Sequence, residues 1–281
     1  MNYQQILEKA SNQLKFKNFK SPKLDAELML AKTLNLCREE VLLNLKQEID
    51  KHSLEKFYYF LNLRKQNRPI AYILKYKFFW KYKFIVNKNV FIPRPETELI
   101  LEKILENVSI NSNKNILEIG TGSGCIAISL MKERLKCRIV AIDKSKKAIE
   151  VAIKNAEMHQ VEKKVKFLNI DVDKYLSNKY DLIISNPPYI KNSELLSLDK
   201  DVKLNEPKIA LSGGFSGLET FFKIIDKSRR LLKNNGMLFL EIGHTQRKDL
   251  MNYLKSKRFS QIKIYKDLSK NDRCLVSTKY Q

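Results

Sequence analysis

The stretch Leu117–Ile128, LEIGTGSGCIAI, turns from a short apolar strand into a helix through three glycines, Gly120, Gly122 and Gly124. Glycines at such a turn permit positive φ and let the backbone approach a ligand closely. The next apolar run, RIVAID, ends at Asp143, whose carboxylate can accept hydrogen bonds from ribose hydroxyls. These residues predict a cofactor site for either a nicotinamide dinucleotide or S-adenosylmethionine.

The spacing around the turn favours S-adenosylmethionine. The dinucleotide fingerprint requires glycine or alanine three residues after the second glycine, and Cys125 stands there. Glu118 instead opens E-x-G-x-G-x-G, the form that methyltransferases of this fold use, and an acid suits the cationic end of S-adenosylmethionine better than a pyrophosphate. Asp171 ends the third strand, VKFLNID, where it can accept from the adenine amino group. We therefore expect S-adenosyl-L-methionine as cofactor and S-adenosyl-L-homocysteine as product.

Strands and helices alternate on both sides of this turn. Strands are predicted at 115–120, 138–143, 165–171, 180–186 and 236–243, and helices at 125–135, 145–160 and 219–234. Two last runs, 260–268 and 273–280, are predicted to pair as an antiparallel end. The alternation predicts an α/β domain over 93–281 with a Rossmann-like, mostly parallel, doubly wound sheet. With the E-x-G-x-G-x-G turn, this domain resembles the class I methyltransferase type. Ligands of such sheets bind at the carboxyl ends of the strands.

The segment before this domain has a different pattern. Residues 1–72 predict a small helical bundle, with helices at 21–35 and 52–67 that begin at Ser21 and Ser53 as N-caps. In the first of these, the face predicted to be buried consists of Leu24, Leu28, Ala31 and Leu34. Residues 73–92, rich in aromatic and β-branched side chains, predict a β-hairpin linker.

The stretch Asp181–Ile190, DLIISNPPYI, carries the predicted catalytic residues. Two adjacent prolines end the buried strand, and their fixed φ can aim the preceding carbonyl groups outward. The side-chain oxygen of Asn186 and the carbonyl of Pro187 can then hold an –NH2 group, while Tyr189 offers an aromatic face to a flat substrate. We expect Asn186, Pro187 and Tyr189 to be catalytic by holding an amine or amide nitrogen toward a methyl donor.

Composition excludes some functions and leaves one alternative open. The formal net charge of +22 permits a nucleic-acid partner, but the lysines are spread along the whole chain, so we expect no stable nucleic-acid partner. The four cysteines and three histidines are scattered and predict no metal site. No run reaches the about 18 apolar residues of a membrane helix. The first residues lack the apolar centre of a signal peptide, so a cytoplasmic protein is expected.

Together, six segments resemble the bacterial release-factor glutamine methyltransferases: FIPRPETE, LEIGTGSGCIAI, AID, SNPPYI, NEPKIALSGGFSGLE and FLEIGHTQ. Members of this family methylate the side-chain amide of the glutamine in the Gly-Gly-Gln motif of peptide-chain release factors. The resemblance covers nearly the whole chain and implies that release factors are the protein substrate. A monomer is the default expectation for the oligomeric state. It implies that the cofactor contacts Glu118, Gly120, Thr121, Gly122, Ser123, Gly124, Asp143, Asp171, Val172 and Asn186. It implies that the substrate contacts Asn186, Pro187, Pro188, Tyr189, Arg94 and Glu98.

This chain departs from the family at the residue after Asp171. Val172 stands where the family often has tryptophan, which predicts the loss of an aromatic contact to adenine. N-P-P-Y alone does not select the substrate, because methyltransferases of nucleic-acid amino groups use similar tetrapeptides. The segment RPETE, Arg94–Glu98, is more selective, although it is also a normal helix start with Pro95 in its first turn. Two alternatives therefore stay open, an rRNA or DNA exocyclic-amino methyltransferase and a ribosomal-protein glutamine methyltransferase.

Overall fold

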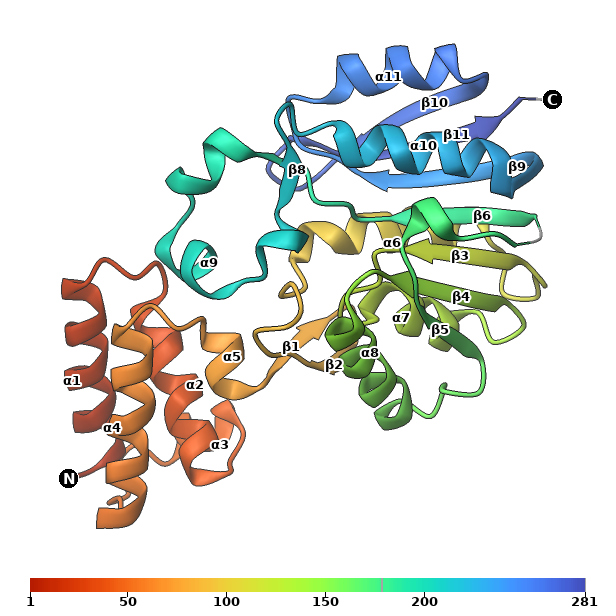
Figure 1. Cartoon of the computed structure of the whole chain (residues 1–281). Coiled ribbons are helices and arrows are strands. Elements are labelled where there is room, and N and C mark those ends of the chain that lie inside the picture. Colours follow the sequence, from red (N-terminus) through yellow and green to blue (C-terminus); the bar gives the residue numbers. More distant parts are fainter. Residues whose placement is uncertain (178, 281) are drawn as a thin grey trace. The chain divides into compact units, whose positions relative to one another are not determined.

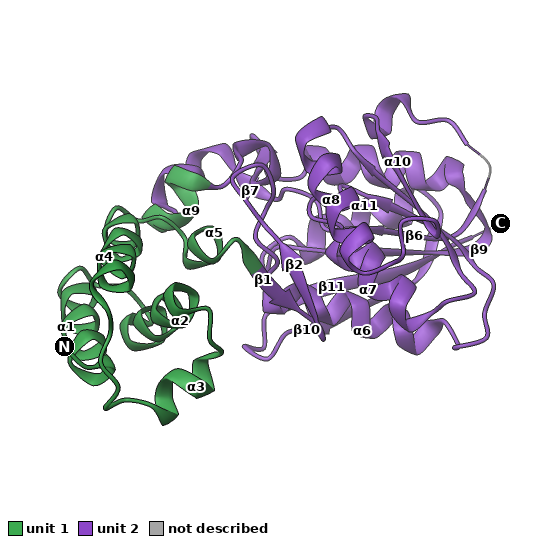
Figure 2. Ribbon diagram, turned by 90° about the horizontal axis from the view of Figure 1, so that it is seen from below, with its two compact units in different colours: residues 1–76, 199–205 green, residues 77–198, 206–281 purple. Residues whose placement is uncertain are grey.

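The computed structural model describes residues 1–177 and 179–280 and divides into two compact units. Unit 1 comprises Met1–Tyr76 and Asp199–Asn205, and unit 2 comprises Lys77–Leu198 and Glu206–Gln281 (Figure 2). The chain therefore returns to unit 1 for a short segment within the second half of the sequence. None of the described helices is both long and apolar enough to cross a membrane.

Unit 1 is a bundle of short helices around one apolar core. Its helices are α1 Tyr3–Phe16, α2 Pro22–Leu34, α3 Arg38–Leu43, α4 Lys51–Lys65, α5 Ile70–Leu74 and α9 Lys200–Asn205 (Figure 1). The N-cap of α4 is Asp50, whose side chain accepts from the Ser53 amide, so the prediction of Ser53 as cap is wrong by one turn. The predicted inner face of α2 is wrong at Leu24, which is 42% exposed while Asp25 and Ala26 are buried, whereas the predicted Ala31 is buried.

A buried arginine explains the inner face of α2. The Nε of Arg64 in α4 donates to Asp25 Oδ2 at 2.7 Å, and its Nη1 donates to Asp201 Oδ2 in α9 at 2.7 Å. Asn205, at the end of α9, donates from Nδ2 to the Asn67 carbonyl at 2.9 Å. Burial raises the pKa of Asp25, although Arg64 opposes the shift. A buried carboxylate is stable only with such partners, so α2 turns Asp25 inward to meet the guanidinium.

A seven-stranded sheet forms the centre of unit 2, in the order β10-β11-β9-β6-β3-β4-β5. Its strands are β3 Asn115–Ile119, β4 Arg138–Asp143, β5 Val165–Asn169, β6 Tyr180–Ser185, β9 Leu232–Glu241, β10 Phe259–Lys266 and β11 Asp272–Lys279. Pairing is parallel from β5 through β9 and antiparallel for β11 with both of its neighbours. The predicted doubly wound sheet with an antiparallel end is confirmed, although β9 begins four residues before the predicted strand.

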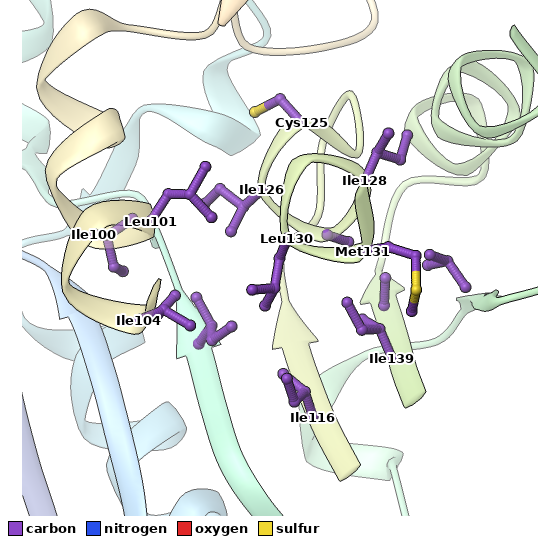
Figure 3. Packing of buried hydrophobic residues seen from close by; sticks show 14 of the residues in the cluster. Ile100, Leu101, Ile104, Ile116, Cys125, Ile126, Ile128, Leu130, Met131 and Ile139 are labelled. Carbon is purple, nitrogen blue, oxygen red and sulfur yellow. The ribbon is translucent and has the colours of Figure 1, made fainter. Parts of the chain in front are cut away.

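Helices cover both faces of the sheet. They are α6 Glu98–Asn107, α7 Cys125–Glu133, α8 Lys146–Met158, α10 Glu219–Leu231 and α11 Arg247–Ser256. Helices α6 and α7 pack on one face, where their apolar side chains meet Ile116 of β3 and Ile139 of β4 (Figure 3). Helices α10 and α11 pack on the opposite face, against Leu117 and Ile183. Alternate residues of β3 thus point into two separate cores, as strand geometry requires.

The predicted β-hairpin is present as β1 Tyr76–Phe79 and β2 Tyr82–Ile85. Phe79 and Phe84 are fully buried in the core that α6 and α7 share. Asn155 of α8 binds both backbone groups of Ile85, accepting from its amide at 2.7 Å and donating to its carbonyl at 3.0 Å. This side chain substitutes for a further strand partner and fixes β2 on unit 2.

Candidate active site

A cavity of about 370 Å³ lies at the carboxyl ends of β3 and β6. These two strands pair in parallel, with Ile119 opposite Ser185, so the turns that follow them begin side by side. The strand order reverses here, because β4 lies on one side of β3 and β6 on the other. The cavity therefore occupies the switch point at which open α/β sheets bind ligands.

The glycine turn after β3 forms one wall of the cavity. Gly122 has φ of 56°, and its amide donates to Asp143 Oδ2 at 3.0 Å. Gly124 has φ of 80°, and a Cβ at this position would lie 2.9 Å from Ile128 Cδ1 and 3.2 Å from Ala152 Cβ. The glycine is needed because helix α7 begins here in close contact with α8. Thr121 and Ser123 line the cavity together with the turn's first glycines.

Three carboxyl groups reach the same cavity from successive strands. Glu118 is 1% exposed and accepts from the Thr121 hydroxyl at 2.6 Å, and burial raises its pKa to about 8. Asp143 also accepts from the Ser145 amide at 2.8 Å, and burial raises its pKa. Asp171 accepts from the Asp173 amide at 3.0 Å and lines the cavity beside Val172. The sequence-predicted acids thus meet at one site.

The Asn186–Tyr189 loop after β6 forms the opposite wall, and all four of its residues line the cavity. Asn186 Nδ2 donates to the Thr97 hydroxyl at 3.1 Å. A Cβ at Gly120 would lie 4.0 Å from the Asn186 carbonyl oxygen, so the glycine turn passes directly beside this loop. The two sequence motifs therefore face each other across the same space.

The tyrosine of this loop is held at both ends. Its hydroxyl makes a long hydrogen bond of 3.5 Å to Glu241 Oε1 and accepts from Arg273 Nη1 at 3.2 Å. Its carbonyl accepts from Gln246 Nε2 at 3.1 Å. Burial raises the pKa of the Tyr189 hydroxyl to about 12, so it stays neutral at physiological pH. These contacts hold the Tyr189 ring in place and do not make its hydroxyl more acidic.

A glycine of the strand β8, Ser212–Gly214, supports the same loop from behind. A Cβ at Gly213 would lie 2.8 Å from the Pro188 carbonyl oxygen, the Tyr189 Cα and the Gly217 carbonyl oxygen. These are backbone atoms that cannot turn aside as a side chain would. The glycine in the SGGFSG segment therefore allows the backbone of β8 to pack directly against the backbone of Pro188 and Tyr189.

The predicted residues Arg94 and Glu98 lie elsewhere than the cavity wall. The described part of the chain contributes neither of them to the lining. Arg94 pairs with the buried Glu206 and stacks 4.6 Å from the Phe91 ring. Glu98 accepts from the Trp80 amide at 2.8 Å, across the hairpin turn. Their role toward the substrate stays a prediction.

The sequence reasoning missed Thr97 and Glu241. Thr97 is 2% exposed and lies between Arg94 and Glu98 in sequence, within the short helix Pro95–Thr97. Glu241 is 2% exposed and ends β9, and the only available signal was an acid at the end of the apolar run FLE. Among residues 1–177 and 179–280, no cluster of three or more His, Cys, Asp or Glu side chains could hold a metal ion.

Two family models match separate parts of the sequence. The family described as the PrmC N-terminal domain matches residues 5–74, and the Methyltransferase small domain matches residues 82–202. Among solved structures, a methyltransferase from Pyrococcus furiosus has a TM-score of 0.54 at 18% identity, covering 70% of this chain and 89% of that one. At this identity the likeness shows the fold, which is the methyltransferase fold.

Two curated relatives match from end to end. The release factor glutamine methyltransferase of Buchnera aphidicola subsp. Baizongia pistaciae is 37% identical over 279 residues, covering 99% of this chain and 100% of the relative. The protein of the same name from Clostridium acetobutylicum is 34% identical over 282 residues, covering 99% of each. The chain therefore belongs to the family of release factor glutamine methyltransferases.

Proposed function

We propose that this chain transfers a methyl group from S-adenosyl-L-methionine to the side-chain amide nitrogen of the glutamine in the Gly-Gly-Gln motif of peptide-chain release factors. The observation that carries the proposal is the shared cavity: the glycine turn and the Asn186–Tyr189 loop leave two paired strands and face each other. The names of the full-length relatives support this choice of substrate.

The cavity fits the cofactor in space and in charge. A Cβ at Gly122 would meet no atom within 4 Å, so the turn borders open space that a ligand can fill. Glu118 would face the cationic methionyl end, Asp143 the ribose hydroxyls and Asp171 the adenine amino group, with Val172 beside the base. When bound, S-adenosyl-L-methionine supplies an activated methyl group, and S-adenosyl-L-homocysteine remains after the transfer.

Asn186 and Pro187 hold the substrate amide. The Asn186 side-chain oxygen and the Pro187 carbonyl each accept one hydrogen of the –NH2 group, and the Tyr189 ring packs against its plane. An amide nitrogen is a weak nucleophile, so the rate must come from orientation and from the exclusion of water. The contacts of Tyr189 with Glu241, Arg273 and Gln246 fit this role because they leave the ring a single position.

The remaining parts of the chain serve recognition in this proposal. The bundle of residues 1–72 selects the release factor, the hairpin segment 73–92 links it, and residues 93–281 carry out methyl transfer. Arg94 and Glu98 act at the substrate side. The enzyme works as a monomer in the cytoplasm, where translation terminates. Despite its formal net charge of +22, it forms no stable complex with nucleic acid.

The test is methyl transfer from labelled S-adenosylmethionine to purified release factor. A release factor with alanine in place of the Gly-Gly-Gln glutamine is the matched control. Label on the wild-type factor and none on the control is the expected result. Label that appears only on rRNA, DNA or a ribosomal protein in a lysate would contradict the proposed substrate while leaving the methyltransferase fold untouched.

Cofactor binding should depend on pH through Glu118. Its raised pKa, about 8, keeps the carboxyl neutral at lower pH, so the anion that attracts a cationic ligand forms only as the pH rises. We expect the affinity for S-adenosylmethionine to increase between pH 6.5 and about 8 by up to about tenfold, which corresponds to about one pKa unit of coupling. Isothermal titration calorimetry across this range measures it.

Glu118→Gln is the reference for this measurement. The amino group of the cofactor loses its own positive charge with a pKa of about 7.7–8.0, as α-amino groups do, so the Glu118 anion attracts only the protonated cofactor and the increase ends near pH 8. Glu118→Gln should therefore show a smaller increase than the wild type. Equal pH profiles would mean that the Glu118 charge does not act on the cofactor.

A further inference from the structure

We propose that Thr97 and Glu241 are positioning residues that orient the side-chain amide of Asn186. They hold its –NH2 group toward Thr97 and thereby present its oxygen to the substrate. Thr97 joins the other two: Asn186 Nδ2 lies 3.1 Å from its hydroxyl, and the hydroxyl lies 2.6 Å from Glu241 Oε2. The proposal rests on the function proposed above, because it concerns the group that holds the substrate amide.

The direction of the hydrogen bonds follows from what each group can donate. An ionised carboxylate only accepts, so the single hydrogen of the Thr97 hydroxyl goes to Glu241. The hydroxyl oxygen can then only accept, and only the –NH2 end of the Asn186 side chain can supply a hydrogen. The amide oxygen is left for the cavity, where an –NH2 group of the substrate needs an acceptor.

Burial makes this arrangement effective. Thr97 and Glu241 are each 2% exposed, so water does not compete for either hydrogen bond. The chain of bonds also increases the electron density on the Asn186 oxygen, because each polarised donor strengthens the next bond. The same carboxylate receives the Tyr189 hydroxyl through Oε1, so one acid positions both the amide clamp and the ring beside it.

The protonation state of Glu241 determines the direction of the hydrogen bonds from Glu241 through Thr97 to Asn186. Burial raises its pKa to about 7, with Arg273 opposing the shift and Glu96 adding to it. The other titratable groups that sense its charge are the Tyr189 hydroxyl and the thiols of Cys125 and Cys274. The pKa of each of these three is raised by burial, so Glu241 is the group here that titrates near neutrality.

A protonated Glu241 can donate to the Thr97 oxygen. The Thr97 hydrogen is then free to point to Asn186, and the amide turns its oxygen toward Thr97 and its –NH2 toward the cavity. Two –NH2 groups then face each other, and the substrate loses its acceptor. We therefore expect kcat, measured at saturating S-adenosylmethionine, to decrease as the pH falls below about 7, separately from the change in cofactor affinity that Glu118 causes.

The experiment compares Thr97→Val and Thr97→Ser with the wild type in the release-factor assay. Valine keeps the shape but removes the hydroxyl, so we expect kcat to fall about 10- to 100-fold, the usual effect of a loosened reacting geometry. Serine restores the hydroxyl and should recover most of the rate. The decrease in kcat at low pH should be present in the wild type and in Thr97→Ser, and absent in Thr97→Val.

Thr33→Val is the matched control. Thr33 is also a buried threonine, 5% exposed, whose hydroxyl donates to the Met29 carbonyl at 2.8 Å, and it lies in α2 of unit 1. Its loss should lower the melting temperature by a similar amount without changing kcat. The dissociation constant for S-adenosylmethionine reports whether Thr97→Val retains the folded cofactor site.

Three outcomes would overturn the proposal. One is a Thr97→Val enzyme with near-normal kcat, and another is a low-pH decrease that persists in Thr97→Val. The third needs no variant: a wild-type kcat that stays constant from pH 8 to pH 6 would show that Glu241 does not set the clamp. Absence of any transfer by the wild type rejects the proposed function together with this inference, whereas each of the three outcomes above rejects the inference alone.

Discussion

Asn186→Ala should reduce methyl transfer to the release factor about 100-fold or more, because it removes the oxygen that we propose holds the substrate amide by an oriented hydrogen bond in the transition state. The alanine also leaves the Thr97 hydroxyl without its donor, but it does not touch the glycine turn or Asp143. The affinity for S-adenosylmethionine should therefore stay nearly unchanged. Single-turnover transfer of labelled methyl, with separate titration of the cofactor, measures both quantities.

Asn107→Ala is a suitable control for this experiment. Asn107 is an exposed asparagine at the end of α6 whose Nδ2 donates to the Lys103 carbonyl at 2.8 Å. Its replacement should leave the transfer rate unchanged. An Asn186→Ala enzyme with a near-normal rate would show that this side chain does not hold the substrate amide, whatever the fate of the other predictions.

Asp143→Ala should chiefly weaken cofactor binding. Asp143 holds two backbone amides of the site, those of Gly122 and Ser145, and it is also the proposed acceptor for the ribose. Hydrogen bonds to charged groups contribute about 1.5–3 kcal/mol, so the dissociation constant for S-adenosylmethionine should rise about 10- to 100-fold. At saturating cofactor kcat should remain close to that of the wild type, because the loop proposed to hold the substrate amide follows another strand, β6.

Calorimetric titration of the cofactor checks this result. Asp143→Asn, which keeps the volume and one acceptor oxygen, should fall between the wild type and the alanine variant. A wild-type dissociation constant for Asp143→Ala would remove Asp143 from the ribose site. A loss confined to kcat would instead assign the residue to the substrate.

The α/β part of the fold follows from local patterns in the sequence. Apolar runs such as NILEIG and RIVAID have the length of buried strands, and each helix between them has a buried face of matching period. Parallel strands joined by helices then dictate a doubly wound sheet, and the turns after the strands must gather at one edge. For this reason the glycine turn, Asp143, Asp171 and the Asn186–Tyr189 loop could be placed together without coordinates.

Helix α2 shows that local sequence patterns cannot predict a buried face that depends on a residue far away in the sequence. Its sequence suggests an inner face through Leu24, but the helix buries Asp25 instead, because Arg64 stands opposite. The two residues are 39 positions apart, and no periodicity within α2 contains that information. The same limit applies to Thr97 and Glu241, whose 144-residue separation becomes a 2.6 Å hydrogen bond only after β9 and α6 have packed.

The return of residues 199–205 to unit 1 bears on how such proteins can be recombined. Helix α9 is held by hydrogen bonds with Arg64 and Asn67, which lie in the first quarter of the chain. Cavity-lining residues between Pro207 and Gly214 follow α9 closely in the sequence. A gene fusion that exchanged only the first 76 residues would bring in a bundle without its own α9. Asp201 would then have to pair with an arginine of the incoming bundle in place of Arg64. The bundle and its distant helix should therefore be inherited as one module, despite being encoded in two pieces.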